Sequence, residues 1–368
     1  MKTLVIGAGS IGANVAYRLA EAGHQTIVVD AGQPAGGTSG ASISWLSNFP
    51  QVAGASPDDL RLRLRINDLF RDLQAEIGGD WLHWTGTLTW ASDPDSQARL
   101  RQDQRRAAQL GVKVDLLTGP QAERIDSSLR LPSHTEVFHE DDGGWVDAPR
   151  MIERLLAAAQ EHGATVMADT RIEQIQRTDR VVAARTDTGV WIDAEAIVVA
   201  AGSNATHIAS MAGCAVPLDL RPGLVVYATP NDGVELRHVL DTPMMNIRPH
   251  PGGGVAIHWR GESLYGHHSF NALDPQEVVD AAARWIPALR GVTASSSRIG
   301  IRPVPPGGPV IGEHPALKRF YLAVSHGGIG WGPLWGLLIR RELDGENVAE
   351  IDAMRPSRFF ASPHHLVE

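Results

Sequence analysis

A cluster of glycines close to the start of the chain has the spacing of a phosphate-binding turn. Gly7, Gly9 and Gly12 follow the apolar run 2–6 and open a helical pattern that continues to Glu21. Gly7 allows a tight turn, Gly9 lets the backbone approach a pyrophosphate, and Gly12 lets the helix pack closely on the strand. The free N–H groups at the start of such a helix bind an anion. The unit therefore predicts a dinucleotide-binding site.

An acidic residue completes this unit. The second apolar run, 26–29, ends at Asp30, close to the spacing of about 20 residues beyond the glycines that is typical of this motif. A carboxylate there accepts hydrogen bonds from ribose hydroxyl groups, and it favours an adenosine with a free 2′-hydroxyl because a 2′-phosphate would be repelled. The alternative is a tight strand–helix turn of the same fold that binds no nucleotide.

The segment after Asp30 bears on which dinucleotide is bound. Residues 31–44 are mostly small and include the hydroxyl side chains of Thr38, Ser39 and Ser42. Such a segment can wrap a second stretch of phosphate and ribityl chain, as FAD requires, whereas an NAD enzyme more often continues directly into its next strand–helix unit. Taken by itself, the segment is equally typical of a flexible surface loop.

Two later apolar runs return the chain to this first unit. Residues 195–202 end at small side chains, and residues 320–330 lead through glycines into a helical pattern from Pro333 to Leu343. The second junction would point another helix N-terminus into the site. Its partial positive charge would stabilise a developing anion such as that of a reduced flavin.

The segments between these runs read as a separate unit. Amphipathic periodicity predicts helices over 57–77 and 94–111, and alternation between proline and glycine turns predicts strands over 221–229, 244–248 and 254–259. We therefore expect two structural units.

Further motifs occur in the order seen in one family of flavoenzymes. They are GGTSGAS at 36–42, DGGWVDAPRMIERLLAAAQEHGA at 142–164, VVAAGSNA at 198–205, GIRPVPPGGPVIG at 300–312, SHGGIGWGPLWG at 325–336 and IDAMRPSRFF at 351–360. Together with the glycine turn, they cover nearly the whole chain. In these residues the chain resembles the D-amino-acid oxidase, glycine oxidase and sarcosine oxidase family of FAD enzymes.

The resemblance implies an α/β fold in which a Rossmann-like FAD-binding domain is interleaved with a substrate domain built on a mixed, largely antiparallel sheet. The FAD-binding domain would take residues 1–45, 143–215 and 298–368, and the substrate domain would take 46–142 and 216–297. The residues expected to hold FAD are Gly7, Gly9, Ser10, Ile11, Gly12, Asp30, Ala31, Gly37, Thr38, Ser39, Ser42, Ile172, Ala201, Gly202, Arg302, Gly327, Gly328, Ile329, Gly330 and Trp331.

We expect FAD to be bound non-covalently. Sarcosine oxidases attach it through a cysteine near the arginine motif, whereas the one cysteine of this chain, Cys214, precedes Pro217 where the chain crosses between the two domains.

Arg302 is the leading candidate for binding a substrate carboxylate. The planar guanidinium group binds both carboxylate oxygens, and this position in GIRPVPPGG matches the arginine that grips the substrate carboxylate in glycine oxidases. By residue type alone it would be a surface arginine beside a proline-rich turn. Arg248 is a second candidate, for which an edge-strand ion pair is an equal alternative. His258 completes the set as a candidate base.

Three tryptophans are expected beside the flavin ring, namely Trp45, Trp259 and Trp331. Strand alternation places His258 and Arg260 on one face and Trp259 on the other, so these three cannot all line the pocket. Tryptophan fills a core far more often than it does chemistry, so we predict a lining role only.

Composition excludes several other chemistries. A single cysteine cannot form an internal disulfide or hold an iron–sulfur cluster, and only three lysines argue against a Schiff-base enzyme. The formal net charge of −9 argues against a nucleic-acid-binding surface. We find no metal-ligand spacing, signal peptide or membrane-spanning run. These absences predict a cytoplasmic protein without a metal site, and its oligomeric state stays open.

The resemblance implies an FAD-dependent oxidoreductase that oxidises the C–N bond of a small amino acid, either a D-amino acid or an N-substituted glycine. Hydride would pass to flavin N5, and the imine formed would hydrolyse. O₂ or another acceptor would take the electrons, and Ala256, where sarcosine oxidases carry a lysine, favours another acceptor. Two alternatives stay open: a 2-hydroxy-acid dehydrogenase with His258 as the base, and a non-catalytic flavin-binding subunit or sensor.

Overall fold

The computed structural model describes residues 1–368 except 50, 52–54, 178–181, 231, 261–273 and 361–368. The first of two large sheets has six strands in the order β19-β20-β13-β1-β2-β9. All neighbours run parallel except β19, which runs antiparallel to β20. The strands are β1 (Lys2–Ile6), β2 (Gln25–Val29), β9 (Thr165–Met167), β13 (Ala196–Val199), β19 (Val310–His314) and β20 (Leu317–Val324).

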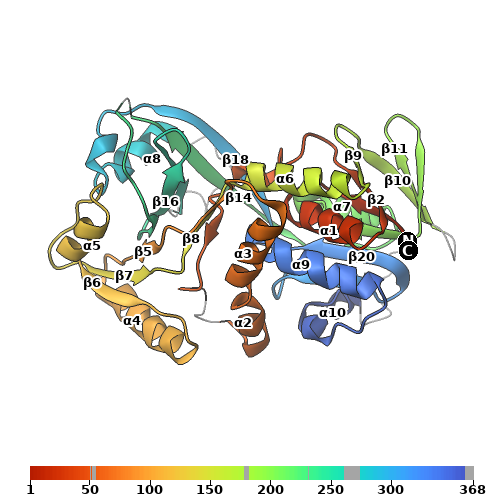
Figure 1. Ribbon diagram of the computed structural model, residues 1–368, viewed down its shortest axis with the longest axis horizontal. Helices are drawn as coiled ribbons and strands as arrows, with labels where there is room; N and C mark the ends of the chain where they lie inside the picture. The colour runs from red at the N-terminus through yellow and green to blue at the C-terminus, as the bar shows by residue number, and fades with distance from the viewer. Residues whose placement is uncertain (50, 52–54, 178–181, 231, 261–273, 361–368) are drawn as a thin grey trace.

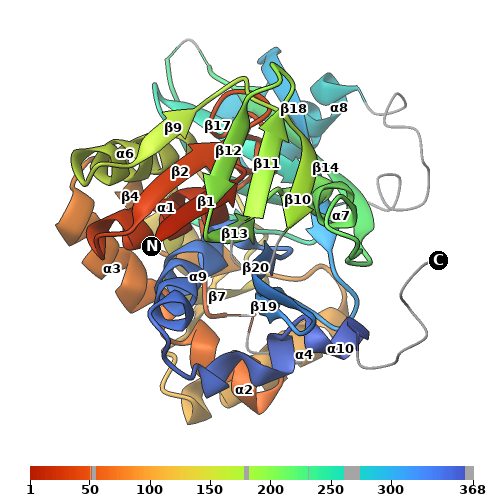
Figure 2. The same ribbon diagram turned by 90° about the vertical axis from the view of Figure 1, so that its right-hand side faces the viewer.

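Both faces of this sheet are covered, as the continuous apolar sequence of its central strands requires. Val5 points to a layer of helices, and its neighbours Leu4 and Ile6 point to the opposite layer. The helical layer holds α1 (Ser10–Glu21), α6 (Ala148–Glu161) and α9 (Gly328–Leu343). The opposite layer holds α7 (Ala205–Ser210) and a small sheet of β10 (Ile172–Arg177), β11 (Val182–Thr186) and β12 (Trp191–Ala194). Figure 2 shows the small sheet on the side away from the helices.

The second large sheet has eight strands in the order β18-β14-β17-β16-β15-β5-β7-β6. Its pairs are antiparallel except β15 with β5. Helices α5 (Gly119–Ile125) and α8 (Pro275–Ala282) pack on one face, and α4 (Pro94–Gln109) lies beside β7. The strands are β5 (Thr87–Thr89), β6 (Asp115–Thr118), β7 (Glu136–Glu140), β14 (Asp219–Ala228), β15 (Val239–Asp241), β16 (Met245–His250), β17 (Gly254–Trp259) and β18 (Ala294–Val304).

The long strands β14 and β18 run from the second sheet toward the first (Figure 1). Near this junction lies a small sheet of β3 (Trp45–Leu46), β8 (Gly144–Val146) and β4 (Leu82–His83). The chain ends, within the described residues, at α10 (Ser357–Phe360).

The single helix expected over 57–77 is two helices, α2 (Pro57–Arg63) and α3 (Ile66–Ile77). The apolar face of α3, formed by Phe70, Leu73 and Ile77, packs into the core shared with α1, α6 and α9. Helix α3 therefore supports the six-stranded sheet, although its sequence lies between segments of the second unit. Helix α2 packs on both sides, with Leu62 in the same core and Leu60 in a cluster with Ala107 of α4 and Phe138 of β7.

The expected α/β class is confirmed, with a mostly parallel sheet beside a largely antiparallel one. The division into residue ranges stays a prediction, and β18 already joins the second sheet at Ala294, before the expected boundary at 298.

Within the described residues, no helix combines the length and the apolar sequence needed to cross a bilayer.

Candidate active site

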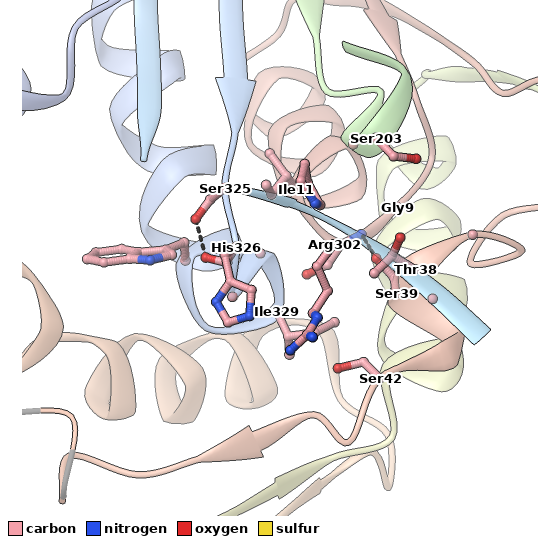
Figure 3. Close-up of a pocket in the computed structure, with 18 of the residues that line it drawn as sticks. Gly9, Ile11, Thr38, Ser39, Ser42, Ser203, Arg302, Ser325, His326 and Ile329 are labelled. Atoms are coloured by element: carbon pink, nitrogen blue, oxygen red, sulfur yellow. Dashed lines mark hydrogen bonds between the residues drawn. The ribbon is translucent and has the colours of Figure 1, made fainter. Parts of the chain in front are cut away.

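A cavity of about 680 Å³ opens where β1, β2 and β13 end, and it extends to the surface of the second sheet. Segments from along nearly the whole chain meet around it (Figure 3). The expected residues that line it are Gly7, Gly9, Ser10, Ile11, Asp30, Ala31, Gly37, Thr38, Ser39, Ser42, Trp45, Ile172, Ala201, Gly202, His258, Arg302, Gly327, Gly328, Ile329, Gly330 and Trp331.

The glycine turn leaves no space for side chains at two positions. Gly7 has φ +110°, and a Cβ atom there would lie 2.4 Å from the carbonyl oxygen of Ala200. A Cβ atom at Gly12 would lie 1.8 Å from the carbonyl oxygen of Gly7. These contacts bring the first turn of α1 against β1. The N-cap residue Gly9 has no side chain to cap this helix. Ser39 accepts from the N–H of Ser10, and the N-terminus beside it faces the cavity, where it can bind an anion.

Asp30 stands at the end of β2 and is oriented by the backbone. One carboxylate oxygen accepts from the Ala8 N–H at 2.6 Å, and the other accepts from the Gly32 N–H at 2.9 Å. A carboxylate oxygen can accept more than one hydrogen bond, which leaves Asp30 able to bind the ribose hydroxyl groups for which it is predicted.

The hydroxyl-rich segment is an ordered part of the cavity wall. Thr38–Ala41 forms a short 3₁₀ helix. Ser39 Oγ accepts from the Ser10 N–H at 3.0 Å, and Thr38 Oγ1 donates to the carbonyl oxygen of Ile301 at 2.6 Å. The segment therefore connects the N-terminus of α1 to β18, next to Arg302.

A second helix N-terminus reaches the cavity at α9. Gly327, with φ +76°, precedes this helix, and no side chain caps it. The helix packs closely on α1, because a Cβ atom at Gly332 would lie 2.7 Å from the side-chain amide of Asn14. Trp331 lines the cavity while only 2% of it is exposed, and its ring stacks on Trp335 with 6.0 Å between centroids.

These features fit FAD. The N-terminus of α1, Asp30 and the segment 37–42 would hold the pyrophosphate, the adenosine ribose and the ribityl chain, and the N-terminus of α9 would face the flavin ring. Cys214 is buried in the core on the other side of the sheet and does not line the cavity, which agrees with a non-covalent cofactor.

Arg302 and His258 meet where the second sheet lines the cavity. Arg302 Nε donates to the carbonyl oxygen of Arg221 at 3.2 Å, and its Nη2 donates to that of Pro222 at 3.0 Å. Figure 3 shows its side chain extending from β18 toward the turn that carries His326. Gly223 lies between the two groups, because a Cβ atom there would be 3.4 Å from both Arg302 Nε and His258 Nε2.

His258 is held by a chain of buried polar groups. Arg260 forms an ion pair of 2.8 Å with Asp241, and Asp241 accepts from the side-chain amide of Asn246 at 2.9 Å. Since the Asn246 nitrogen donates to Asp241, its oxygen faces His258 Nδ1 at 3.4 Å. Nδ1 then carries the proton and Nε2 the lone pair. Burial, with the charges of Arg302, Arg260 and His326, lowers the pKa of His258 to about 3, so the ring is neutral.

Three expected residues do not line the cavity. Gly12 lies beneath the turn, where it packs the helix on the strand. Trp259 packs against the core of the second sheet, on the face opposite His258 as alternation predicts. Arg248 shares the face of Asn246 but lies two residues further along β16.

Arg248 differs from Arg302 in that it is buried and does not line the cavity. Its Nε donates to the Ile43 carbonyl oxygen at 2.7 Å and its Nη1 to that of Pro249 at 2.8 Å, and its guanidinium lies 4.5 Å from the centre of the Trp145 ring. Burial lowers the pKa of Arg248 to about 10. This arginine therefore supports the wall behind the cavity.

Among the residues that line the cavity and that sequence reasoning missed are Arg63, Gly223 and Asn246. Alternation along β16 and β17 would have found Asn246, because it pairs directly with His258. No sequence signal separates Gly223 from a turn glycine, or Arg63 from the other arginines of its helix.

The chain has relatives among characterised flavoenzymes. The family model described as FAD dependent oxidoreductase (DAO) matches residues 2–339. The glycine oxidase of Geobacillus kaustophilus is 26% identical over 91% of this chain and 90% of its own length. The monomeric sarcosine oxidase of Bacillus sp. strain B-0618 is 26% identical over 58% of this chain and 54% of its own length.

The fold also matches solved structures. The crystal structure of the Geobacillus kaustophilus glycine oxidase superposes with a TM-score of 0.87 at 23% identity, covering 97% of this chain and 98% of that one. The match of the family model over most of the sequence shows that the chain belongs to the FAD-dependent oxidoreductase (DAO) family of flavoproteins.

Proposed function

We propose that the protein oxidises the C–N bond of a small amino acid, either a D-amino acid or an N-substituted glycine, with FAD held non-covalently. The observation that carries this is the meeting of Arg302 with the neutral His258 across Gly223, where the second sheet lines the cavity. A cation beside an uncharged acceptor is complementary to a carboxylate beside an amine. The names of the glycine oxidase and sarcosine oxidase relatives point to the same substrate class.

In this reaction each of the following groups would have its own role. Arg302 binds the substrate carboxylate and fixes the α-carbon. His258 Nε2 accepts a hydrogen bond from the amine N–H, which keeps the nitrogen lone pair directed toward the C–H bond that breaks. When bound, FAD supplies the hydride acceptor. The N-terminus of α9 stabilises the negative charge that develops there.

The histidine favours an amine over a 2-hydroxy acid. Oxidation of a hydroxyl group needs a base that takes the proton completely, and a ring whose pKa is lowered to about 3 is a weak base. An amine can arrive from water already neutral, so it requires only a hydrogen-bond acceptor. One outcome of the test below would identify the protein as a 2-hydroxy-acid dehydrogenase instead.

The test is anaerobic reduction of the FAD-loaded protein. Panels of D-amino acids, N-alkyl glycines and 2-hydroxy acids are mixed with it, and loss of the oxidised flavin absorbance is followed. We expect the amines to bleach the flavin of the parent protein. Arg302→Gln should raise the KM strongly. Arg221→Gln, on the neighbouring strand, is the control and should leave the KM unchanged. Bleaching by hydroxy acids alone would replace the proposal with the dehydrogenase, and no bleaching by any panel would favour a flavin-binding subunit or sensor.

The electron acceptor is the second part of the proposal. None of the three lysines lines the cavity, and a cation beside the flavin speeds electron transfer to O₂ by stabilising negative charge. The arginines that line the cavity, among them Arg63 and Arg302, could supply such a charge in place of a lysine. The acceptor is therefore O₂ or another molecule, and the missing lysine favours the second. Admission of air to the reduced protein tests this, because rapid return of the flavin absorbance would identify an oxidase instead.

A further inference from the structure

A second arginine faces the cavity. Arg63 is the last residue of α2 and lines the cavity. Its guanidinium carbon lies 4.8 Å from the centre of the Trp331 ring. Trp331 is itself buried and stacked on Trp335, so the guanidinium rests on a fixed aromatic surface. Stacking of this kind holds an arginine in place while its N–H groups stay available.

Within the described residues, Arg63 has no ion-pair partner. Its Nε is buried and has no hydrogen-bond partner there. Burial lowers its pKa, and among the described residues Asp59 opposes this effect. A half-buried cation without a counter-charge is destabilising, and an anion that enters the cavity would offset this.

The described residues that line the cavity offer no anion to Arg63. Asp30 is the only acid among them, and its carboxylate is bonded to the N–H groups of Ala8 and Gly32. A ligand would supply the anion. His326, which also lines the cavity, has its pKa lowered by burial and by the charges of Arg302, Arg221 and Arg63. Arg63 and Arg302 therefore both lie within electrostatic reach of one imidazole ring.

We propose that Arg63 forms a second anion-binding subsite and that the preferred substrate is an amine with two carboxylates. The α-carboxylate would bind Arg302, and a second carboxylate, on the side chain or on the nitrogen substituent, would bind Arg63. This rests on the proposed amine oxidation. It goes further by naming the substrate class: acidic D-amino acids or N-carboxyalkyl glycines rather than their neutral analogues.

The first experiment measures binding without turnover. The FAD-loaded protein is titrated with malonate, succinate and glutarate, and with acetate, propionate and butyrate, and the shift of the flavin spectrum gives each Kd. A charge-assisted hydrogen bond is worth a factor on the order of 10 to 100 in affinity. We expect at least one dicarboxylate to bind at least tenfold more tightly than its monocarboxylate analogue, and Arg63→Gln to reduce this ratio to within about twofold.

The matched variants assign the effect to one side chain. Arg61→Gln removes an exposed arginine from the same helix and should leave the ratio unchanged. Arg63→Lys keeps the charge and should restore part of it. An unchanged ratio in Arg63→Gln, or no dicarboxylate preference in the parent protein, would overturn the subsite. So would a loss of FAD affinity in Arg63→Gln with the ratio intact, because Arg63 would then serve the cofactor.

The second experiment uses substrates. Reduction rates are compared for D-aspartate against D-alanine and for N-(carboxymethyl)glycine against N-ethylglycine, which distinguishes a side-chain carboxylate from a nitrogen-linked one. Reduction by neutral amines without any preference for acidic ones would overturn this inference and leave the proposed function in place. Arg63-dependent dicarboxylate binding without reduction by any amine would overturn the proposed function and leave the subsite.

Discussion

Asn246 lies directly opposite His258 in the pairing of β16 with β17, and its side-chain oxygen is 3.4 Å from Nδ1 of that histidine. The other end of the amide is bonded to the buried Asp241, so the amide cannot turn over without losing that bond. One side chain therefore determines which imidazole nitrogen of His258 carries the proton.

We predict that Asn246→Leu lowers kcat/KM by about 10- to 100-fold, in the range of general positioning effects. The physical reason is that His258 loses the acceptor that fixes its tautomer. A double-mutant cycle with His258→Leu measures this. The two changes should be strongly non-additive, and losses that simply multiply would show that Asn246 acts on structure alone.

Gly223 gives a steric prediction. Gly223→Ala would place a Cβ atom 3.4 Å from Arg302 Nε and from His258 Nε2, which is ordinary contact distance, so activity should change only a few-fold. Gly223→Val would force the two groups apart and should reduce flavin reduction about 100-fold or more. Valine suits a β-strand, so the protein should still bind FAD. Stopped-flow reduction and FAD titration test this, and full activity in the valine variant would contradict it.

A variant of Arg248 tests whether this side chain supports the cavity wall or binds the substrate. Arg248→Met leaves the carbonyl oxygens of Ile43 and Pro249 without their donor, which should lower the free energy of unfolding by about 1 to 3 kcal/mol. Urea unfolding measures this loss. The KM should stay within about twofold of the parent value. A raised KM at unchanged stability would instead return Arg248 to the substrate-binding set.

Glu140 makes stability depend on pH. This buried carboxylate on β7 accepts from the N–H groups of Asn48 and Phe49 at 2.8 Å and 3.1 Å and from the Ser47 hydroxyl. Burial, with a smaller effect of Asp142, raises its pKa from 4.5 to about 7, although the three hydrogen bonds by themselves lower the pKa. Because the pKa is higher in the folded state, the protonated group stabilises the fold below pH 4.5, and this contribution is lost as the pH rises through 7.

The measurement is the difference in unfolding free energy between the parent protein and Glu140→Gln. It should fall by about 3 kcal/mol between pH 4.5 and pH 7.5. Glu136→Gln, on the same strand and ion-paired with Arg101, is the control and should follow the parent. A difference that does not change with pH would contradict the assignment to Glu140.

The parts of the site that repeat with a fixed spacing were predictable from the sequence. The glycines before α1, the acid after β2 and the glycines before α9 mark backbone turns, and each lies where its spacing predicted. Alternation along β17 correctly separated His258 from Trp259.

Positions that depend on packing were not predictable. The apolar periodicity of 57–77 continues across the break between α2 and α3, so nothing local indicates that Arg63 faces the cavity. Arg248 and Asn246 share one face of β16, and only the position of Ile43 and Trp145 determines that the arginine is taken up by the wall.

The bond from Thr38 Oγ1 to the Ile301 carbonyl oxygen joins the segment expected to wrap the cofactor to the residue before Arg302. Whatever orders one of these segments also orders the other. If the proposed substrate binds Arg302, occupancy of the two halves of the cavity is then thermodynamically coupled. By reciprocity, the factor by which bound substrate changes the affinity for FAD equals the factor by which bound FAD changes the affinity for substrate. With positive coupling, the substrate itself would favour the FAD-loaded form of the enzyme in a cell short of flavin.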